Sequence, residues 1–324
     1  MPQFDLPLAE LRTYAPDLAV PADLEAFWEG TLAETRAYPL AVSCAAVVTG
    51  LSVVDSFDVS FAGFGGATIR AWLHVPANRS GRLPAVVEYI GYGGGRGLPH
   101  ERILYAAAGY AHLLMDTRGQ GSTWSSGDTP DPQATGGPAH PGFMTQGILD
   151  PATYYYRRVF SDAVRAIEAV RTFDFVDAGR VAVTGGSQGG GLTLAAASLL
   201  PDVAAAMPDV PFLSDYPRAT TLIDRDPYGE IVRYLKAHRD HVDRALRTLA
   251  YFDVSILGRR AKAPALFSVG LMDEVCPPST VYAAYNAYGG PKEIREYPYN
   301  EHEGGQGFHE VEKLRWLADR FAGR

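Results

Sequence analysis

One stretch, residues 180–200, constrains the fold more than any other because it predicts a strand, a sharp turn and a helix in immediate succession. Residues 181–183 are an apolar run typical of a buried parallel strand, and residues 192–200 are rich in Ala and Leu, which favour helix. Between them, residues 185–189 read Gly-Gly-Ser-Gln-Gly and match the G-x-S-x-G pattern of a nucleophile elbow. The glycines are needed because strand and helix approach closely around a strained serine. The pattern therefore predicts that Ser187 is a catalytic nucleophile.

The turn by itself leaves two other interpretations open, since a glycine-rich turn before a helix can bind a phosphate or simply pack tightly. A serine that transfers acyl groups needs a histidine base and a carboxylate that orients the base. In α/β-hydrolases the acid and the histidine follow the serine in that order, each in a loop after a strand. The chain offers both, because Asp273 follows a predicted strand at 265–270 and His302 follows another at 293–297.

Two neighbouring residues compete for these roles. Glu274 adjoins Asp273, and the position directly behind the strand favours Asp273. His309 follows His302 where the last predicted helix begins, so a surface or capping role would be sufficient for it. We therefore predict a triad of Ser187, Asp273 and His302.

Backbone N–H groups are needed to bind the oxyanion that develops during acyl transfer. The helix after the elbow has unpaired N–H groups at its N-terminus, so the N–H of Gln188 is one predicted donor. The second donor is expected in the loop Ile90-Gly-Tyr-Gly93, which closes an early buried strand. Tyr92 is the predicted donor there, although a plain glycine turn would have the same pattern.

The other segments predict an α/β fold in a single domain over residues 1–324, with a mostly parallel central sheet flanked by helices. Two strands starting at Pro84 and Ala111 enclose a helix near 102–108, and such a βαβ unit implies parallel strands. Further segments are expected as follows: an N-terminal arm over 1–40, an antiparallel hairpin over 42–75, a long loop over 117–153, a helix over 154–172, a strand over 203–210, a helical insertion over about 212–262, and helices over 279–288 and 310–321.

Composition restricts the possible partners. The chain has 324 residues and a formal charge of -8, which argues against binding to nucleic acid or to an anionic membrane. It shows neither a signal-peptide pattern nor an apolar run of membrane-spanning length, so a cytoplasmic location is expected. Cys44 and Cys276 are too far apart for a C-x-x-C site, and both are expected to be reduced thiols in or near the core. No metal or other cofactor is expected.

Motifs along nearly the whole chain extend this pattern. They are Phe4-Asp-Leu-Pro-Leu, Phe27-Trp, Gly91-Tyr, Arg118-Gly-Gln-Gly, Gly147-Ile-Leu-Asp with Tyr154-Tyr-Tyr-Arg, Thr184-Gly-Gly-Ser-Gln-Gly-Gly-Gly, Asp273 with Pro277-Pro-Ser-Thr, and His302-Glu-Gly-Gly. Together they resemble the acetyl xylan esterase and cephalosporin C deacetylase family, carbohydrate esterase family seven of the α/β-hydrolases. The correctly spaced Arg-Gly-Gln-Gly and Gly-Gly-Ser-Gln-Gly-Gly motifs are far more specific than the elbow alone.

The resemblance implies the same triad and the same oxyanion donors. It also implies an intracellular, metal-free enzyme that removes acetyl groups from short acetylated xylo-oligosaccharides and from cephalosporin C-type esters. Members of the family form homohexamers, trimers of dimers whose active sites face an internal cavity. By analogy of position, a pocket for the small acyl group is expected at Tyr92, Phe212, Pro227 and Val275.

One departure and three alternatives accompany this interpretation. The family commonly has His-Gly-Tyr before the glycine loop, and Ile90 stands here in place of that histidine, which bears on the packing behind the oxyanion loop. A serine exopeptidase or a lactone hydrolase would share the fold, although no Glu-Glu pair for a free amine is recognisable. A ligand-binding protein that kept the fold without the chemistry is the third alternative.

Overall fold

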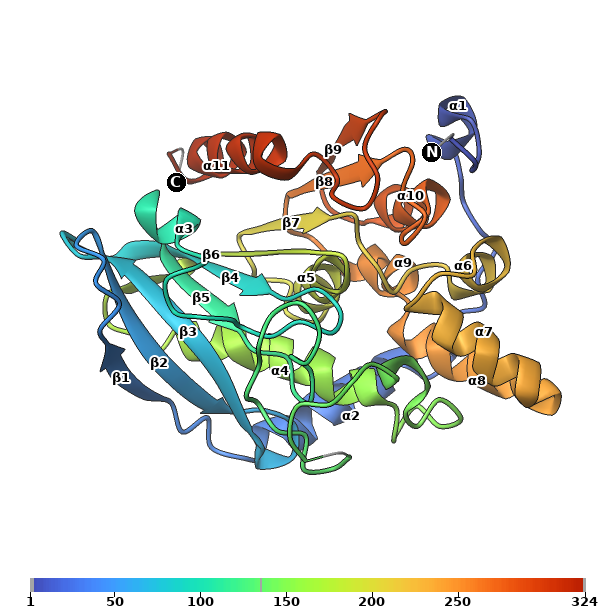
Figure 1. Ribbon diagram of the computed structural model, residues 1–324, viewed down its shortest axis with the longest axis horizontal. Helices are drawn as coiled ribbons and strands as arrows, with labels where there is room; N and C mark the ends of the chain where they lie inside the picture. The colour runs from blue at the N-terminus through green and yellow to red at the C-terminus, as the bar shows by residue number, and fades with distance from the viewer. Residues whose placement is uncertain (1–2, 135, 323–324) are drawn as a thin grey trace.

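The computed structural model describes residues 3–134 and 136–322, and in this part of the chain nine strands form one sheet (Figure 1). The order across the sheet is β1-β2-β3-β5-β4-β6-β7-β8-β9. Strands β4 to β9 run parallel to their neighbours, and β3 joins them by an antiparallel pairing with β5. The strands are β1 (Ser43–Val47), β2 (Val54–Ala62), β3 (Thr68–Pro76), β4 (Leu83–Tyr89), β5 (Ala111–Met115), β6 (Val176–Gly186), β7 (Ala205–Asp209), β8 (Ala265–Gly270) and β9 (Lys292–Tyr297).

The antiparallel edge has one strand more than the sequence predicts. Instead of a hairpin over 42–75, β1, β2 and β3 form a three-stranded antiparallel unit, with a turn at Phe64–Gly66 between the last two. Strand β1 lies at the edge and its side chains are largely exposed, so its sequence carries little of the alternation that marks a half-buried strand. For the same reason the prediction that Cys44 lies in or near the core is wrong, because this thiol is exposed on β1.

Helices cover both faces of the sheet. Figure 1 shows α3 and α11 on one side and α2, α4 and α5 on the other. Helix α3 is shorter than predicted, and α11 begins four residues earlier than predicted, at Gln306 instead of Glu310. The helices are α1 (Leu8–Leu11), α2 (Leu24–Arg36), α3 (Leu104–Ala107), α4 (Tyr155–Val170), α5 (Gln188–Leu199), α6 (Tyr216–Leu222), α7 (Tyr228–Ala237), α8 (Val242–Leu249), α9 (Val254–Leu257), α10 (Pro278–Ala287) and α11 (Gln306–Ala322).

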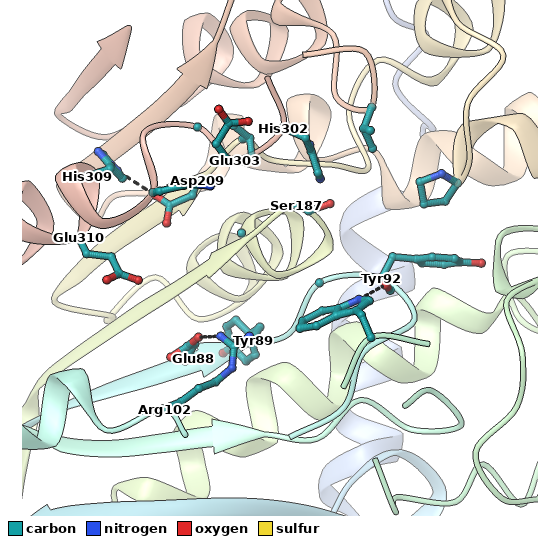
Figure 2. A pocket seen from close by; sticks show the side chains of 18 of the residues that line it. Glu88, Tyr89, Tyr92, Arg102, Ser187, Asp209, His302, Glu303, His309 and Glu310 are labelled. Atoms are coloured by element: carbon teal, nitrogen blue, oxygen red, sulfur yellow. Dashed lines mark hydrogen bonds and ion pairs between the residues drawn. The ribbon is translucent and has the colours of Figure 1, made fainter. Parts of the chain in front are cut away.

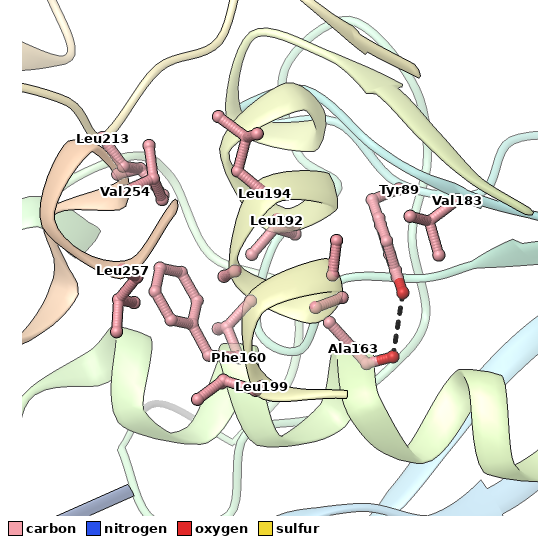
Figure 3. Packing of buried hydrophobic residues seen from close by; sticks show 14 of the residues in the cluster. Tyr89, Phe160, Ala163, Val183, Leu192, Leu194, Leu199, Leu213, Val254 and Leu257 are labelled. Atoms are coloured by element: carbon pink, nitrogen blue, oxygen red, sulfur yellow. Dashed lines mark hydrogen bonds between the residues drawn. The ribbon is translucent and has the colours of Figure 1, made fainter. Parts of the chain in front are cut away.

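The core is divided by the sheet into a large and a small part. Neighbouring side chains of a strand point to opposite faces, so Val87 of β4 packs in the large cluster while Val86 packs in the small one with α11. Helix α5 is buried along its whole length and packs against the sheet, α4 and α9 (Figure 3). The hydroxyl of Tyr89 donates to the carbonyl of Ala163 at 2.9 Å and ties β4 to α4. The strand and helix that flank Ser187 are therefore held on a rigid base.

The helical insertion and the N-terminal arm pack against each other. Residues 216–257 are mostly helical, as predicted for the insertion, and comprise α6 to α9. Two contacts join the N-terminal arm to this region. Asp5 forms an ion pair with Arg218 at 2.7 Å, and the indole N–H of Trp28 donates to the backbone carbonyl of Tyr251 at 3.0 Å. No helix in the described part of the chain is both long and apolar enough to span a membrane.

Candidate active site

Ser187 lies at the bend between β6 and α5, in the strained conformation that an elbow requires. Its backbone angles are φ 59° and ψ -120°, a region that non-glycine residues rarely adopt. The bend is tight, because an added Cβ on Gly189 would lie 2.2 Å from the Tyr89 carbonyl oxygen. The N–H of Ser187 donates to the Asp209 carbonyl at 3.0 Å, so the adjacent strand fixes the bend. The serine hydroxyl consequently faces a cavity at the carboxyl end of the sheet.

Asp273 and His302 meet beside this serine, from the loops after β8 and β9. His302 Nδ1 lies 2.9 Å from Asp273 Oδ2. The other carboxylate oxygen of Asp273 accepts from the N–H groups of Val275 at 2.7 Å and Cys276 at 2.8 Å. Asp273 is fully buried, whereas His302 is partly exposed and lines the cavity. Figure 2 shows the imidazole of His302 directed toward Ser187. The structure thus brings together all three residues of the predicted triad.

The two competing residues have other partners. Glu274 forms an ion pair with Arg225 at 2.5 Å and does not contact the imidazole of His302. His309 is within the first turn of α11, but it is only 2% exposed, so of the two expected roles, at the surface or in a helix cap, the surface role is wrong. Its Nε2 lies 2.9 Å from Asp209 Oδ1 and its Nδ1 is 3.0 Å from the Tyr297 hydroxyl.

The predicted oxyanion donors belong to two segments that meet at the elbow, since a Cβ added to Gly91 would lie 4.0 Å from Ser187 Cβ. Gln188 is the first residue of α5, so its N–H has no acceptor within the helix. Among the described residues, no hydrogen bond uses the N–H of Tyr92. The carbonyl of Tyr92 accepts from the Trp124 indole at 2.9 Å, which fixes the orientation of that peptide.

Gln120, which belongs to the Arg118-Gly-Gln-Gly motif, links the two segments that carry the predicted donors. The side-chain oxygen of Gln120 accepts from the N–H of Gly93 at 2.8 Å, and its amide nitrogen donates to the side-chain oxygen of Gln188 at 2.8 Å. The Gln188 amide nitrogen in turn donates to the carbonyl of Ile90 at 3.0 Å. Gln120 therefore fixes the relative position of the two segments that carry the predicted oxyanion donors. Its motif spacing gave the only sequence signal, and its partners could not be identified without the fold.

Ile90, the departure from the family pattern, is accommodated by the core. Its side chain is 1% exposed, and its carbonyl is held by Gln188 as described above. The backbone that carries Tyr92 is consequently anchored without a histidine at this position.

The cavity has a volume of about 970 Å³ and two chemically different ends. Near Ser187 it is lined by three of the four residues expected for the acyl group, Tyr92, Pro227 and Val275. Phe212, the fourth, does not reach the cavity wall, because it is fully buried behind Tyr92 at a ring distance of 6.4 Å. Its position in a loop after β7 could not distinguish a lining residue from a supporting one.

Tyr92 itself is held rigidly. Its hydroxyl donates to the carboxylate of Glu230 at 2.8 Å and accepts from the N–H of Phe143 at 2.9 Å. Burial and the nearby Glu230 carboxylate raise the pKa of the Tyr92 hydroxyl well above its usual value, so it stays protonated. Burial likewise raises the pKa of Glu230. The ring therefore forms a fixed wall beside the nucleophile.

The other end of the cavity is charged. It is lined by Glu88, Arg102, Asp209, His309 and Lys313 (Figure 2). Glu88 pairs with Arg102 at 2.6 Å, and Asp209 pairs with Lys313 at 2.5 Å. Burial alone would raise the pKa of Asp209, but the ammonium of Lys313 and the imidazole of His309 outweigh it and hold that pKa below its usual range. Sequence patterns gave no signal for this end, since its members come from four separate segments.

A possible metal set coincides with the triad. Among the described residues, Asp273, Cys276 and His302 are the group whose ligand atoms lie within 4.8 Å of one another. Asp273 and His302 are already bonded to each other, and burial raises the pKa of the Cys276 thiol well above its usual value. This set is therefore interpreted as a catalytic pair with an unreactive thiol beside it.

Comparison with known proteins gives a consistent result. Residues 1–320 match the model of the acetyl xylan esterase (AXE1) family. The structure of an acetyl xylan esterase from Paenibacillus sp. R4 is similar, with a TM-score of 0.90 and 39% identity over 97% of this chain and 99% of that one. Acetyl xylan esterase 1 from Thermoanaerobacterium sp. JW/SL YS485 gives a TM-score of 0.90 and 34% identity over 98% of this chain and 100% of that one.

A relative identified by sequence is also an acetyl esterase. The acetyl esterase Axe7A of Xylanibacter ruminicola is 31% identical over 290 residues, which are 87% of this chain. The chain spans 63% of the length of that relative. The α/β-hydrolase fold predicted from the elbow is confirmed by these structural matches. Because the family model matches residues 1–320, the chain belongs to the acetyl xylan esterase family.

Proposed function

We propose that this protein is a serine esterase that removes acetyl groups from acetylated xylo-oligosaccharides through an acetyl-serine intermediate. One observation carries the proposal: His302 Nδ1 lies 2.9 Å from the buried Asp273 carboxylate while its ring is directed toward Ser187 at the elbow. Family membership and the acetyl xylan esterases of similar structure support the substrate class.

The first half of the reaction acylates the serine. Because Nδ1–H of His302 is donated to Asp273, Nε2 can accept the Ser187 proton as the hydroxyl oxygen attacks the acetyl carbonyl carbon. The N–H groups of Tyr92 and Gln188 bind the developing oxyanion. The bond from the carbonyl carbon to the sugar oxygen then breaks, and the leaving alcohol takes the proton from His302.

The second half releases acetate. A water molecule loses a proton to His302 Nε2 as it attacks the acetyl carbonyl, and the same N–H donors bind the second oxyanion. The bond to Ser187 breaks, and the serine oxygen recovers its proton from His302. Asp273 stays ionised throughout and stabilises the imidazolium form of His302 in each half.

The walls beside the nucleophile favour a small acyl group. The ring of Tyr92 cannot swing away, because Glu230 and the N–H of Phe143 hold its hydroxyl. Pro227 and Val275 are the other apolar neighbours of the cavity at this end. Longer acyl chains would require this fixed wall to move.

The test compares initial hydrolysis rates for acetyl, butyryl and octanoyl esters of one aryl alcohol, with Ser187→Ala as control. The proposal predicts a strong preference for acetyl, and a fall in turnover on the order of 10⁴- to 10⁶-fold in the variant. A preference for octanoyl, or normal activity of Ser187→Ala, would refute it.

The alternative functions have distinct outcomes in related assays. An exopeptidase would cleave aminoacyl anilides faster than aryl acetates, and a lactone hydrolase would prefer cyclic esters. A non-catalytic binding protein would give no burst of alcohol when mixed with a stoichiometric active-site titrant. The intact order of Ser187, Asp273 and His302 favours an esterase over the last of these.

Three finer assignments complete the proposal. Cephalosporin C-type acetates are proposed as further substrates, on the family resemblance. A homohexamer is proposed as the assembly, and light scattering would test it by a mass of six 35.0 kDa chains. A cytoplasmic location is proposed from the sequence pattern and is tested by cell fractionation.

A further inference from the structure

One aromatic side chain beside Ser187 has an exposed face that the mechanism described above does not use. Trp124 lies in the long loop after β5 and lines the cavity together with Ser187. Its side chain is 54% exposed, whereas Trp28 and Trp316 are buried at 1% and 8%. A large apolar ring left exposed inside a cavity commonly marks a contact with a ligand.

The indole is held in one orientation. Its N–H donates to the carbonyl of Tyr92 at 2.9 Å. Both chain neighbours are tied to the glycine loop, because the Thr123 hydroxyl donates to the Gly93 carbonyl at 2.7 Å and the Ser125 hydroxyl donates to the Gly95 carbonyl at 2.9 Å. Trp124 is therefore a preformed surface, and little side-chain entropy is lost when a ligand contacts it.

The position of the ring relative to the nucleophile suits the alcohol part of an ester. A Cβ built on Gly91 would be 3.4 Å from the Trp124 ring and 4.0 Å from Ser187 Cβ, so one glycine separates them. The acyl group must lie near Tyr92, whose ring is largely enclosed by Phe143 and Phe212. The more open surface of Trp124 is left for the leaving alcohol.

The polar groups near the ring indicate which alcohol fits. The guanidinium of Arg102 lies 5.7 Å from the Trp124 ring centre and is paired with Glu88. Both residues line the cavity and offer donors and acceptors for hydroxyl groups. An apolar face flanked by donors and acceptors matches a pyranose, which has C–H groups on its faces and hydroxyl groups at its rim.

We propose that Trp124 is a sugar-binding platform on which the pyranose ring of the leaving alcohol stacks, with Arg102 and Glu88 as partners for its hydroxyl groups. The proposal rests on the esterase function proposed above and adds the residue that selects a sugar over other alcohols. It assigns a role to the loop over 117–153, whose length alone did not show what it does.

The kinetic test measures kcat/KM for two substrates, an acetylated xylobiose and ethyl acetate, and takes the ratio of the first value to the second. Trp124→Ala is expected to lower the ratio of their kcat/KM values by about 10- to 100-fold, mainly through KM for the sugar, while Trp124→Phe keeps most of it. Leu98→Ala is the control, since Leu98 is 52% exposed in the loop after β4 but does not line the cavity, and its ratio should not change.

A binding readout complements the rates. In a Ser187→Ala background, xylotriose should shift the tryptophan emission, and the shift should be lost when Trp124→Phe is added. If Trp124→Ala lowers kcat/KM for both esters equally, the ring merely supports the oxyanion loop and the proposal is overturned. An unchanged ratio or an unchanged emission shift also overturns it. Failure of the wild-type protein to hydrolyse either ester would instead refute the proposed function.

Discussion

The buried ion pair between Lys313 and Asp209 offers a quantitative test of how the last helix is fixed to the sheet. The ammonium of Lys313 on α11 lies 2.5 Å from Asp209 at the end of β7, and their side chains are only 9% and 18% exposed. Lys313→Met would keep most of the side-chain volume and remove the charge. The Asp209 carboxylate would then be left with His309 as its remaining partner.

The expected loss can be estimated from this geometry. Removing one partner of a buried pair costs about 3–5 kcal/mol, because the other charge stays buried without compensation. His309 Nε2 remains 2.9 Å from Asp209 Oδ1 as one polar partner, so the lower end, about 3 kcal/mol, is expected. For 324 residues the unfolding entropy is roughly 0.7 kcal/mol/K, so the melting temperature should fall by about 4 °C.

Urea and thermal unfolding at several pH values would measure this loss. The pKa of Asp209 is lowered in the folded protein, so the stability from its charge is present above the unfolded value near ~4 and is lost as the pH falls through the folded pKa. In Lys313→Met this carboxyl should protonate more easily, and the stability difference from wild type should shrink below pH ~5. Lys236→Met, at an exposed lysine of α7, is the control. A Lys313→Met protein within about 0.5 kcal/mol of wild type at pH 7 would refute the reasoning.

Two further predictions concern backbone packing and acid stability. Gly189→Ala should destabilise the protein by about 3 kcal/mol in urea unfolding, because the new Cβ would meet the Tyr89 carbonyl oxygen at 2.2 Å. Gly307→Ala, where nothing lies within 4 Å, should cost nothing, and equal stabilities of the two variants would contradict the predicted clash. Burial, with a smaller effect of the nearby His112, lowers the pKa of His74 to about 3, so between pH ~6.5 and 3 the unfolded chain binds a proton that the folded protein does not. The free energy of unfolding of the wild type should therefore decrease by up to ~1.4 kcal/mol for each unit by which the pH falls in that window. His74→Gln should flatten this dependence of stability on pH. If wild type and variant show parallel slopes, His74 is not the source of the dependence.

The elements around the nucleophile could be predicted because their signals are local. A glycine-rich turn between a β-branched run and an Ala- and Leu-rich run fixes where Ser187 lies. Since carboxyl ends of parallel strands share one edge of a sheet, Asp273 and His302 could be placed near it from their position after strands. The edge strand β1 was missed because its exposed side chains do not alternate.

The partners of polar side chains could not be predicted in this way. His309 was expected in a surface or capping role, yet it is buried against Asp209 and Tyr297, because α11 begins at Gln306 and packs over the end of β7. Phe212 was expected to line the cavity, but the sequence does not show that Tyr92 stands in front of it. Contacts of this kind depend on which distant segments meet.

The sequence by itself determined that Ser187, Asp273 and His302 each follow a strand in that order, because strand, turn and helix preferences depend on near neighbours in the chain. Only the tertiary structure decided which side chains surround them. Gln120 connects the loop after β4 to the first turn of α5, and Trp124 stands beside Ser187, although both lie more than sixty residues before it in the chain. Such contacts arise when the sheet brings the carboxyl ends of its strands together, and no local pattern of residues encodes them.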